Sequence, residues 1–187
     1  ELREESSPFH RTKYLNSMLA TVETPFVVNH DADVIVPRHE MLTALGLLRI
    51  LPEVDFVYPY GHMDDSKSLL RIVREDESTW INFVKCTLLG DFSSVLIDGC
   101  TFVYNAAYGQ SIFAKTSSYI SAGGENEQFV SWGAEDVERY VRFVKLGYGV
   151  ARVHGGYVFH LEHERGTDSS SKNPNFKNNE DLWKQIQ

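Results

Sequence analysis

A stretch near the beginning of the chain, Pro25-Phe-Val-Val-Asn-His-Asp31-Ala-Asp33-Val-Ile-Val36, most constrains the fold. An apolar run ends in two carboxylates separated by one residue, and a second apolar run follows them. The β-branched and aromatic residues after Pro25 predict a buried strand. We expect the chain to turn where this strand ends, at the rim of an α/β sheet, so that the two carboxylates converge.

Carboxylate oxygens are the ligands that hard divalent cations prefer, and one or two of them leave room for phosphate oxygens and water. The stretch therefore predicts a site for a metal ion and a diphosphate. The spacing of Asp31 and Asp33 alone is weakly specific, because a chain rich in aspartate contains it by chance. Its weight comes from its position at the end of an apolar strand.

The composition predicts a single domain over residues 1–187 with no transmembrane segment. Of the 187 residues, 42% are hydrophobic, which is enough for one sizeable core. The net charge of −8 argues against a nucleic-acid partner, because phosphate contacts need clustered Lys and Arg. The chain starts at Glu1 rather than Met, so we expect its natural N-terminus to lie further upstream.

The cysteine content bears on the compartment. Cys86 and Cys100 fall in a helix-like and a strand-like stretch, so two free thiols are expected rather than a disulfide. This favours a reducing compartment, a bacterial cytoplasm at or near the membrane, with the Golgi lumen as the alternative.

Apolar periodicity predicts an alternating order of strands and helices. Besides the strand after Pro25, strands are expected at 54–60, 99–107, 110–115, 149–153 and 156–161. Helices are expected at 11–22, 38–51, 80–88, 115–122 and 135–146, whereas 69–73 fits either state. The strand, helix and strand at the start predict a βαβ unit in a parallel sheet. The polar segment 162–179 predicts a flexible lid, and a final amphipathic turn follows it at 181–186.

Three of these helices carry apolar residues at the spacing of a single buried face. The expected core-facing stripes are Leu15, Met18, Leu19 and Val22 in the first helix, Met41, Leu42, Leu45 and Leu48 in the second, and Val137, Tyr140, Val141 and Val144 in the last.

The segment from Ser121 to Asp136 is the most informative one for function. Two adjacent glycines permit a tight turn, and the flat side chain of Trp132 beside Gly133 suits stacking on a sugar ring. Glu135 and Asp136 then open the last predicted long helix. Acidic residues in a first helical turn ordinarily act as caps and dipole partners, which is the structural alternative to a general base.

A third segment, from Tyr157 to Arg165, places His160 at the end of a predicted strand. This histidine could complete a mixed oxygen and nitrogen site with Asp33, and His163 would substitute for it if the strand ended later. No His-x3-His or Cys-x2-Cys spacing occurs in the chain, so a structural zinc site is not expected.

These segments resemble the GT-A glycosyltransferases, nearest to the β-1,4-galactosyltransferase group and bacterial relatives such as the chondroitin polymerases. Residues 9–16, Phe-His-Arg-Thr-Lys-Tyr-Leu-Asn, are similar to the family segment Phe-x-Arg-x-Lys-x-x-Asn. His-Asp31-Ala-Asp33 is similar to its Asp-x-Asp motif, and residues 108–115 are similar to its donor-side strand. Trp132-Gly133-Ala134-Glu135-Asp136 is similar to the more specific Trp-Gly-Gly-Glu-Asp signature.

The resemblance implies a GT-A α/β fold, with a mixed sheet flanked by helices and without its first βα units. It implies an inverting transfer of a hexosyl unit from a UDP-sugar, of the UDP-galactose or N-acetylhexosamine type, to a saccharide hydroxyl, with Mn²⁺ or Mg²⁺ as cofactor. The implied metal ligands are Asp33 and His160, with Asp136 as catalytic base. The implied donor-binding residues are Phe9, Arg11, Lys13, Asp31 and Gly109, and the implied acceptor-binding residues are Trp132, Gly133 and Glu135.

Three positions depart from the family pattern. Ala134 replaces a glycine of the signature, and Tyr108 replaces the first of two glycines beside the donor. Tyr157 stands where the galactosyltransferases have a metal-binding methionine. The donor sugar and the full metal shell are therefore left open.

Two other functions are kept as alternatives. A haloacid-dehalogenase-like phosphohydrolase also opens with an apolar strand and Asp-x-Asp, with Asp31 as nucleophile and Asp64-Asp65 as a later metal pair. A sugar-binding domain derived from a glycosyltransferase, without catalysis, is the second alternative.

Overall fold

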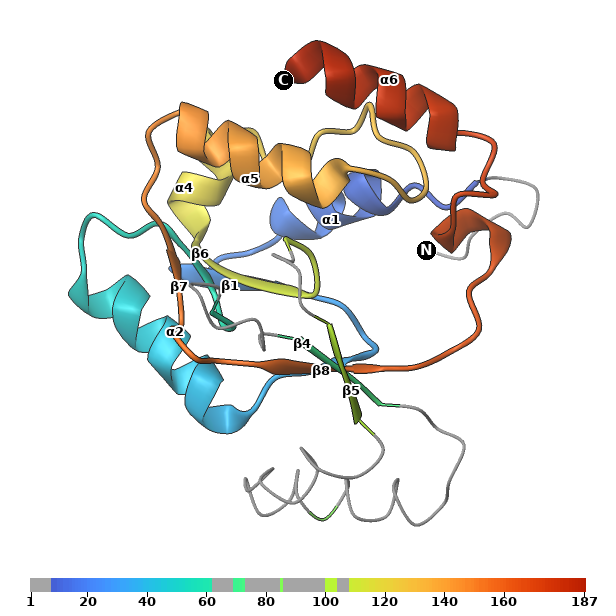
Figure 1. Cartoon of the computed structure of the whole chain (residues 1–187). Helices are drawn as coiled ribbons and strands as arrows, with labels where there is room; N and C mark the ends of the chain where they lie inside the picture. The colour runs from blue at the N-terminus through green and yellow to red at the C-terminus, as the bar shows by residue number, and fades with distance from the viewer. Residues whose placement is uncertain (1–7, 62–68, 73–84, 86–99, 104–107) are drawn as a thin grey trace. The chain divides into compact units, whose positions relative to one another are not determined.

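The computed structural model describes residues 8–61, 69–72, 85, 100–103 and 108–187 (Figure 1). The chain forms two compact units, each assembled from separate segments of sequence. The first unit comprises Glu1–Val27, Lys115–Tyr148 and Glu164–Gln187, and the second comprises Val28–Ala114 and Gly149–His163. Cys86, the pair Asp64-Asp65 and most of the helix predicted at 80–88 lie outside the described residues.

The second unit is built on two four-stranded sheets. One has the strand order β1-β6-β3-β7, with β1 at Phe26–His30, β3 at Phe56–Tyr58, β6 at Ser111–Lys115 and β7 at Val150–Arg152. Strand β3 pairs antiparallel with β6 and parallel with β7. The sheet is therefore mixed, as the predicted fold class requires. The parallel sheet predicted from the strand–helix–strand order holds for β3 and β7 but not for β6, which lies between β1 and β3 and runs antiparallel to β3.

The other sheet has the order β2-β8-β4-β5, with β2 at Val34–Ile35, β4 at Leu69–Ile72, β5 at Cys100–Val103 and β8 at Val158–Leu161. Within the segment 69–73, for which either state is expected, the described residues Leu69–Ile72 thus form a strand. Strand β8 runs antiparallel to β2, with His160 opposite Val34, and parallel to β4. This register brings the end of the Asp-x-Asp stretch beside His160.

Strand β1 is less buried than its apolar sequence predicts. Only Asn29 is buried in it, and the side chain of Val28 is 43% exposed. The cause is its place at the end of the strand order, where β6 is its one neighbour among the strands that the structure describes. The fully buried strand of this sheet is β3, whose three residues, Phe56, Val57 and Tyr58, are all 0% exposed.

Helix α2 (Arg38–Ile50) lies in the second unit and contacts β3. Its buried residues are Glu40, Ala44 and Leu48, which recur every four positions. Met41 and Leu42 are exposed, so the stripe predicted for this helix is wrong in its first turns. The helix instead turns the Glu40 carboxylate inward, where its Oε1 lies 3.0 Å from Nε2 of His39.

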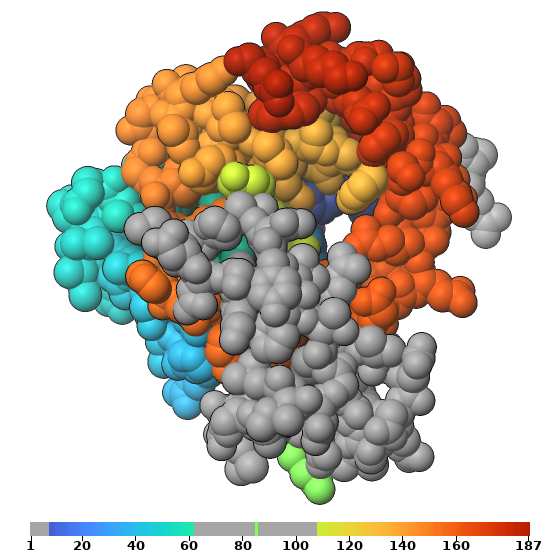
Figure 2. All heavy atoms as spheres, viewed as in Figure 1, coloured from blue at the N-terminus to red at the C-terminus, as the bar shows by residue number. Residues whose placement is uncertain are grey.

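The first unit is mainly helical within the described residues. Its elements are α1 (Arg11–Leu19), α4 (Thr116–Ser121), α5 (Glu135–Lys145), the short 3₁₀ helix η1 (Thr167–Ser169) and α6 (Phe176–Ile186). Helices α5 and α6 contact one another and adjoin on the surface seen in Figure 2. Helix α1 ends three residues earlier than predicted. It buries Thr12 and Leu19, whereas Met18 of the predicted stripe is exposed.

Helix α5 faces its unit with charged residues. The buried positions are Glu135, Glu138, Arg139 and Phe143, whereas Val144 of the predicted stripe is 49% exposed. The prediction from apolar spacing was wrong here because ion pairs compensate the burial of these charges. In one of them, Arg142 Nε lies 2.8 Å from Glu138 Oε1.

The segment predicted as a lid contains regular structure. Helix α6 begins at Phe176, inside the range 162–179, so the predicted final turn is a longer helix. Before it, the backbone N–H groups of Phe9 and Trp132 donate to Oδ2 and to the carbonyl oxygen of Asp168, at 3.3 and 3.2 Å. Movement of this segment stays a prediction. None of the described helices combines the length and apolarity that a membrane-spanning helix needs.

Candidate functional site

The Asp-x-Asp stretch turns where β1 ends. The backbone N–H of Val34 donates to the carbonyl oxygen of Asp31 at 3.1 Å, which closes a four-residue turn. The carbonyl oxygen of Asp33 then accepts from the N–H of Leu161 at 2.8 Å. The turn and the pairing with β8 together fix the backbone of Asp33 beside His160.

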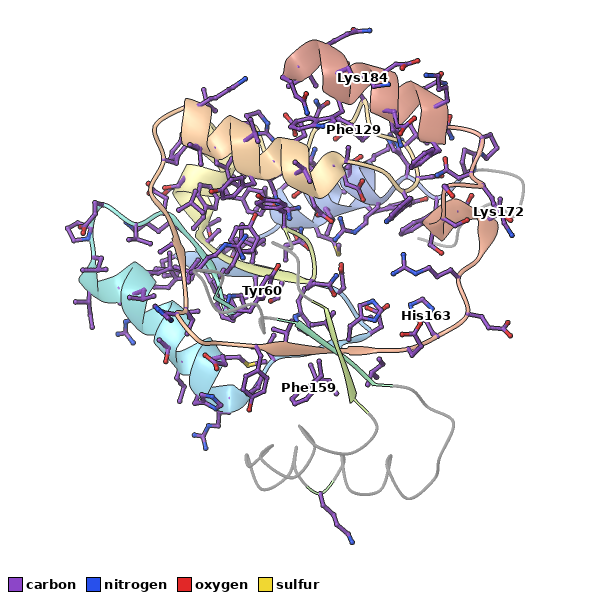
Figure 3. The ribbon with its side chains drawn as sticks, in the orientation of Figure 1. Tyr60, Phe129, Phe159, His163, Lys172 and Lys184 are labelled. Atoms are coloured by element: carbon purple, nitrogen blue, oxygen red, sulfur yellow. The ribbon has the colours of Figure 1, made fainter. Side chains whose placement is uncertain are left out.

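Three donor groups meet in the second unit. Oδ2 of Asp33 lies 2.8 Å from Nε2 of His163 and 3.6 Å from Nε2 of His160. The two imidazoles stack, with centroids 5.7 Å apart and planes at 20°. His160 is buried and belongs to β8, whereas His163 is exposed just beyond that strand (Figure 3). Both histidines considered from the sequence thus accompany Asp33, rather than one substituting for the other.

The three residues fit a divalent cation by their chemistry. Each offers one ligand atom, and these atoms lie within 4.8 Å of one another. Ligands of an ion bound at about 2.1 Å stand roughly 3 to 4.2 Å apart, so a small contraction would close the shell. One carboxylate and two imidazoles suit a transition metal such as Mn²⁺ better than Mg²⁺, which prefers oxygen ligands.

Asp31 lies near the predicted donor-side strand. Its backbone N–H donates to the carbonyl oxygen of Gln110 at 2.9 Å, and the hydroxyl of Tyr60 donates to that of Gly109 at 2.6 Å. Gln110 holds a left-handed backbone, with φ of 70°, although the sequence singles out the glycine before it. Asp31 is not one of the three clustered ligands.

The first unit carries the remaining predicted residues. Phe9 is 40% exposed and stacks on Tyr14, with centroids 5.6 Å apart, and Lys13 is exposed. Arg11 contacts both acidic residues of the signature: its Nη1 lies 3.2 Å from Oδ1 of Asp136 and 3.8 Å from Oε1 of Glu135. The position predicted to bind the donor thus also links α1 to the acidic pair.

The acidic pair is presented by a left-handed turn. Gly133 has a φ of 142° and Ala134 a φ of 59°, immediately before α5 begins. The N–H of Gly133 donates to Oε2 of Glu135 at 2.8 Å, so this side chain folds back over the turn. The Asp136 side chain points elsewhere, toward Arg11 and toward Arg139, which follows it by three positions in α5.

The two carboxyls titrate differently. Burial, together with the negative charge of Asp136, raises the pKa of Glu135 to about 7. Burial alone would also raise the pKa of Asp136, but Arg139 and Arg11 outweigh it and hold that pKa below its ordinary value of 3.8. Near neutral pH, Asp136 is therefore an anion, whereas Glu135 is present in both its protonated and its ionised form.

Sequence reasoning missed Arg139 and Glu125. Nη2 of Arg139 lies 2.9 Å from Oδ1 of Asp136, and its Nη1 donates to both oxygens of Glu125, at 3.0 and 3.1 Å. Arg139 stands three positions after Asp136, a helical spacing at which opposite charges meet, and this signal could have identified it.

Sequence reasoning also missed the support of Trp132. The indole lies nearly parallel to the ring of Phe176, with centroids 5.6 Å apart and planes at 9°. Side-chain amides of Asn173 and Asn179 donate to its carbonyl oxygen at 2.9 and 3.3 Å. Trp132 stays 39% exposed, so it can still contact a ligand.

Comparison with known families places these residues in context. Residues 97–164 match the family model described as the N-terminal domain of galactosyltransferase. The match spans the Trp132 to Asp136 signature and His160, and it confirms the galactosyltransferase resemblance over this part of the chain. Among curated proteins, none matches the chain.

Several solved glycosyltransferase structures are similar to the chain at low identity. The catalytic domain of Drosophila β1,4-galactosyltransferase 7 with xylobiose is 15% identical, with a TM-score of 0.42 over 78% of this chain and 45% of that one. A mutant of the same enzyme with manganese, UDP-Gal and xylobiose is 16% identical, with a TM-score of 0.48 over 82% of this chain and 50% of that one. Glucosyl-3-phosphoglycerate synthase from Mycobacterium tuberculosis, with Mn²⁺ and UDP-glucose, is 17% identical, with a TM-score of 0.46 over 90% of this chain and 50% of that one. The chain spans about half the length of these proteins.

Proposed function

We propose that this chain carries the catalytic residues of an inverting, metal-dependent glycosyltransferase. It would move a hexosyl unit from a UDP-sugar, of the UDP-galactose or N-acetylhexosamine type, to a saccharide hydroxyl. The observation that carries the proposal is the meeting of Asp33, His160 and His163. The second aspartate of an Asp-x-Asp stretch and two histidines 127 and 130 residues further on supply the donor set that a diphosphate-bound cation needs.

The cation held by these residues would neutralise the charge that develops on the leaving diphosphate. Asp136 would accept the proton of the acceptor hydroxyl as that oxygen attacks the anomeric carbon, with inversion of configuration. A quarter of its side chain (26%) is exposed, which leaves room for this contact. Its lowered pKa makes it a weak base, so orientation has to supply more of the rate than basicity does.

Trp132 and Glu135 would hold the acceptor. The exposed part of the indole offers a flat apolar surface, and sugars stack on such surfaces through their C–H faces. Glu135 can donate a hydrogen bond when protonated and accept one when ionised, and it populates both forms near pH 7.

Binding experiments test the metal part of the proposal. We expect Mn²⁺ to bind, as read by electron paramagnetic resonance, and UDP to bind more tightly when Mn²⁺ is present. The variants Asp33→Asn and His163→Ala should each weaken both events. His154→Ala is the matched control, because it removes an exposed histidine from the same unit outside the cluster.

A turnover screen tests the reaction. We expect Mn²⁺-dependent release of UDP from at least one of UDP-galactose, UDP-glucose, their N-acetyl forms and UDP-glucuronate, with saccharide acceptors present. Asp136→Asn should retain UDP binding and lose about 99% of transfer, the usual size of a general-base effect. Transfer that survives this change would place the base elsewhere.

The same samples separate the two alternatives. Hydrolysis of a generic aryl phosphate, abolished by Asp31→Asn, would favour the phosphohydrolase. Saccharide binding without Mn²⁺-dependent UDP binding would favour the non-catalytic domain. Nothing in the phosphohydrolase assigns a role to the two imidazoles beside Asp33.

A further inference from the structure

The buried face of α5 holds a chain of charges that ends at the proposed base. Arg139 and Glu125 have side chains that are each 1% exposed, and they face one another across the first unit. A buried arginine is tolerated when acceptors compensate the loss of water, and this guanidinium has one on each side. Its Nη1 donates to the carboxylate of Glu125, and its Nη2 forms an ion pair with Oδ1 of Asp136.

Glu125 is itself held from several directions. The hydroxyl of Tyr119, in α4, donates to its Oε1. Its backbone N–H donates to Oδ1 of Asn16, in α1, at 2.7 Å, and its carbonyl oxygen accepts from Nδ2 of Asn16 at 2.9 Å. The backbone of Glu125 is thus held by α1 and its carboxylate by α4, and both oxygens of that carboxylate accept from Nη1 of Arg139.

The result at Asp136 is directional. Arg139 and Arg11 both contact Oδ1, at 2.9 and 3.2 Å. We propose that Arg139 and Glu125 are positioning residues for Asp136: they anchor Oδ1 and thereby leave Oδ2 to the acceptor hydroxyl, an assignment that rests on the proposed function.

The charged groups around Asp136 set the expected direction of each variant. They are Arg11 from α1, Arg139 and Glu135 from α5, and Glu125 through Arg139. Arg139→Lys replaces the planar fork with a single ammonium that cannot reach both carboxylates. Glu125→Gln keeps the shape and removes one negative charge, so the guanidinium stays beside Asp136 and loses its rigid anchor.

The first measurement does not need activity. The pKa of Asp136 is read from its carboxyl ¹³C resonance, which is assigned with Asp136→Asn. Arg139→Lys should raise the proton affinity of Asp136 about tenfold, and Glu125→Gln should not raise it. The matched control is Glu138→Gln, which removes an equally buried carboxylate from the same helix, where its partner is Arg142. It should leave the Asp136 titration in place.

The second measurement follows UDP release from UDP-galactose against pH. Arg139→Lys should shift the acidic limb of the pH–rate profile to higher pH, because the pKa of the base rises. Glu125→Gln should lower kcat about tenfold with KM nearly constant. The Glu138→Gln control should keep the wild-type profile. If Arg139→Lys leaves the Asp136 titration unchanged, or if Glu138→Gln changes it as much, the positioning role is wrong whether or not the protein turns over.

The two outcomes separate the claims. Shifted titrations without any UDP release in the wild type would uphold the contact chain and refute the glycosyltransferase proposal. UDP release by the wild type, with an Asp136 titration that the variants leave unchanged, would uphold the glycosyltransferase proposal and refute the positioning role. If Arg139→Lys does not fold, Glu125→Gln decides on its own: a wild-type kcat in that variant would overturn the assignment.

Discussion

Glu135→Gln gives the sharpest test of the electrostatics of the acidic pair. The pKa of Glu135 is about 7 in the folded protein, against an ordinary value of 4.5. Below pH 4.5 both states hold the proton, and above pH 7 neither does. Between these limits the folded state binds the proton more tightly, so its stability falls as the pH rises. The glutamine cannot ionise, and its oxygen can still accept from the N–H of Gly133.

The magnitude follows from the shift. At about 1.4 kcal/mol per pKa unit, raising the pKa from 4.5 to about 7 corresponds to about 3 kcal/mol. We therefore expect the free energy of unfolding of Glu135→Gln, minus that of the wild type, to rise by about 3 kcal/mol between about pH 4.5 and about pH 8. For a chain of this length, that is a relative change in Tm of roughly 6 to 12 °C.

The assay is urea denaturation of both proteins across this pH range, followed by circular dichroism and by tryptophan fluorescence. Asp136→Asn is the informative comparison, because the pKa of Asp136 is lowered whereas that of Glu135 is raised. The two groups therefore change the stability in opposite directions as the pH rises. The stabilising contribution of Asp136 is present above the ordinary value of 3.8 and is lost as the pH falls. Parallel stability curves for the wild type and Glu135→Gln would refute the assignment of a near-neutral pKa to Glu135.

Three further predictions rest on separate contacts. His163→Ala should weaken Mn²⁺ binding at least about tenfold in a direct titration, whereas His154→Ala should not; equal affinities would remove His163 from the ligand set. Ala134→Gly should raise the free energy of unfolding by roughly 0.5 to 1 kcal/mol in the same urea assay, because a residue with φ of 59° is strained unless it is glycine, and a loss of stability would contradict this. Phe176→Leu should raise KM for a saccharide acceptor with little effect on UDP binding, because Trp132 loses its stacking partner; an unchanged acceptor KM would show that the indole is held without it.

The sequence predicted local states well where one physical rule decides them. The turn at Asp31 to Asp33 follows from the end of an apolar run, and α4 and α5 begin near their predicted residues. His160 was predicted as a partner of Asp33 because it ends a strand, and the β2–β8 register places the two side by side.

Pairing and charge burial were harder to predict. The position of β6 between β1 and β3 depends on long-range pairing that no local pattern encodes. The inward face of α5 was wrongly predicted because apolar spacing favours Val144, whereas Arg139 is buried by virtue of Glu125, fourteen residues away. Such a pair is identified only when both partners are in place.

The alignment of β8 with β2 has a consequence for how such a metal centre can be lost. Neighbouring residues of a strand point to opposite sides, so the insertion of one residue before Phe159 would place Phe159 in the position that His160 holds opposite Val34. The chain would keep every ligand and still present a phenyl ring to Asp33. In an evolving lineage, a one-codon insertion at this point would abolish cation binding as surely as replacing the histidine.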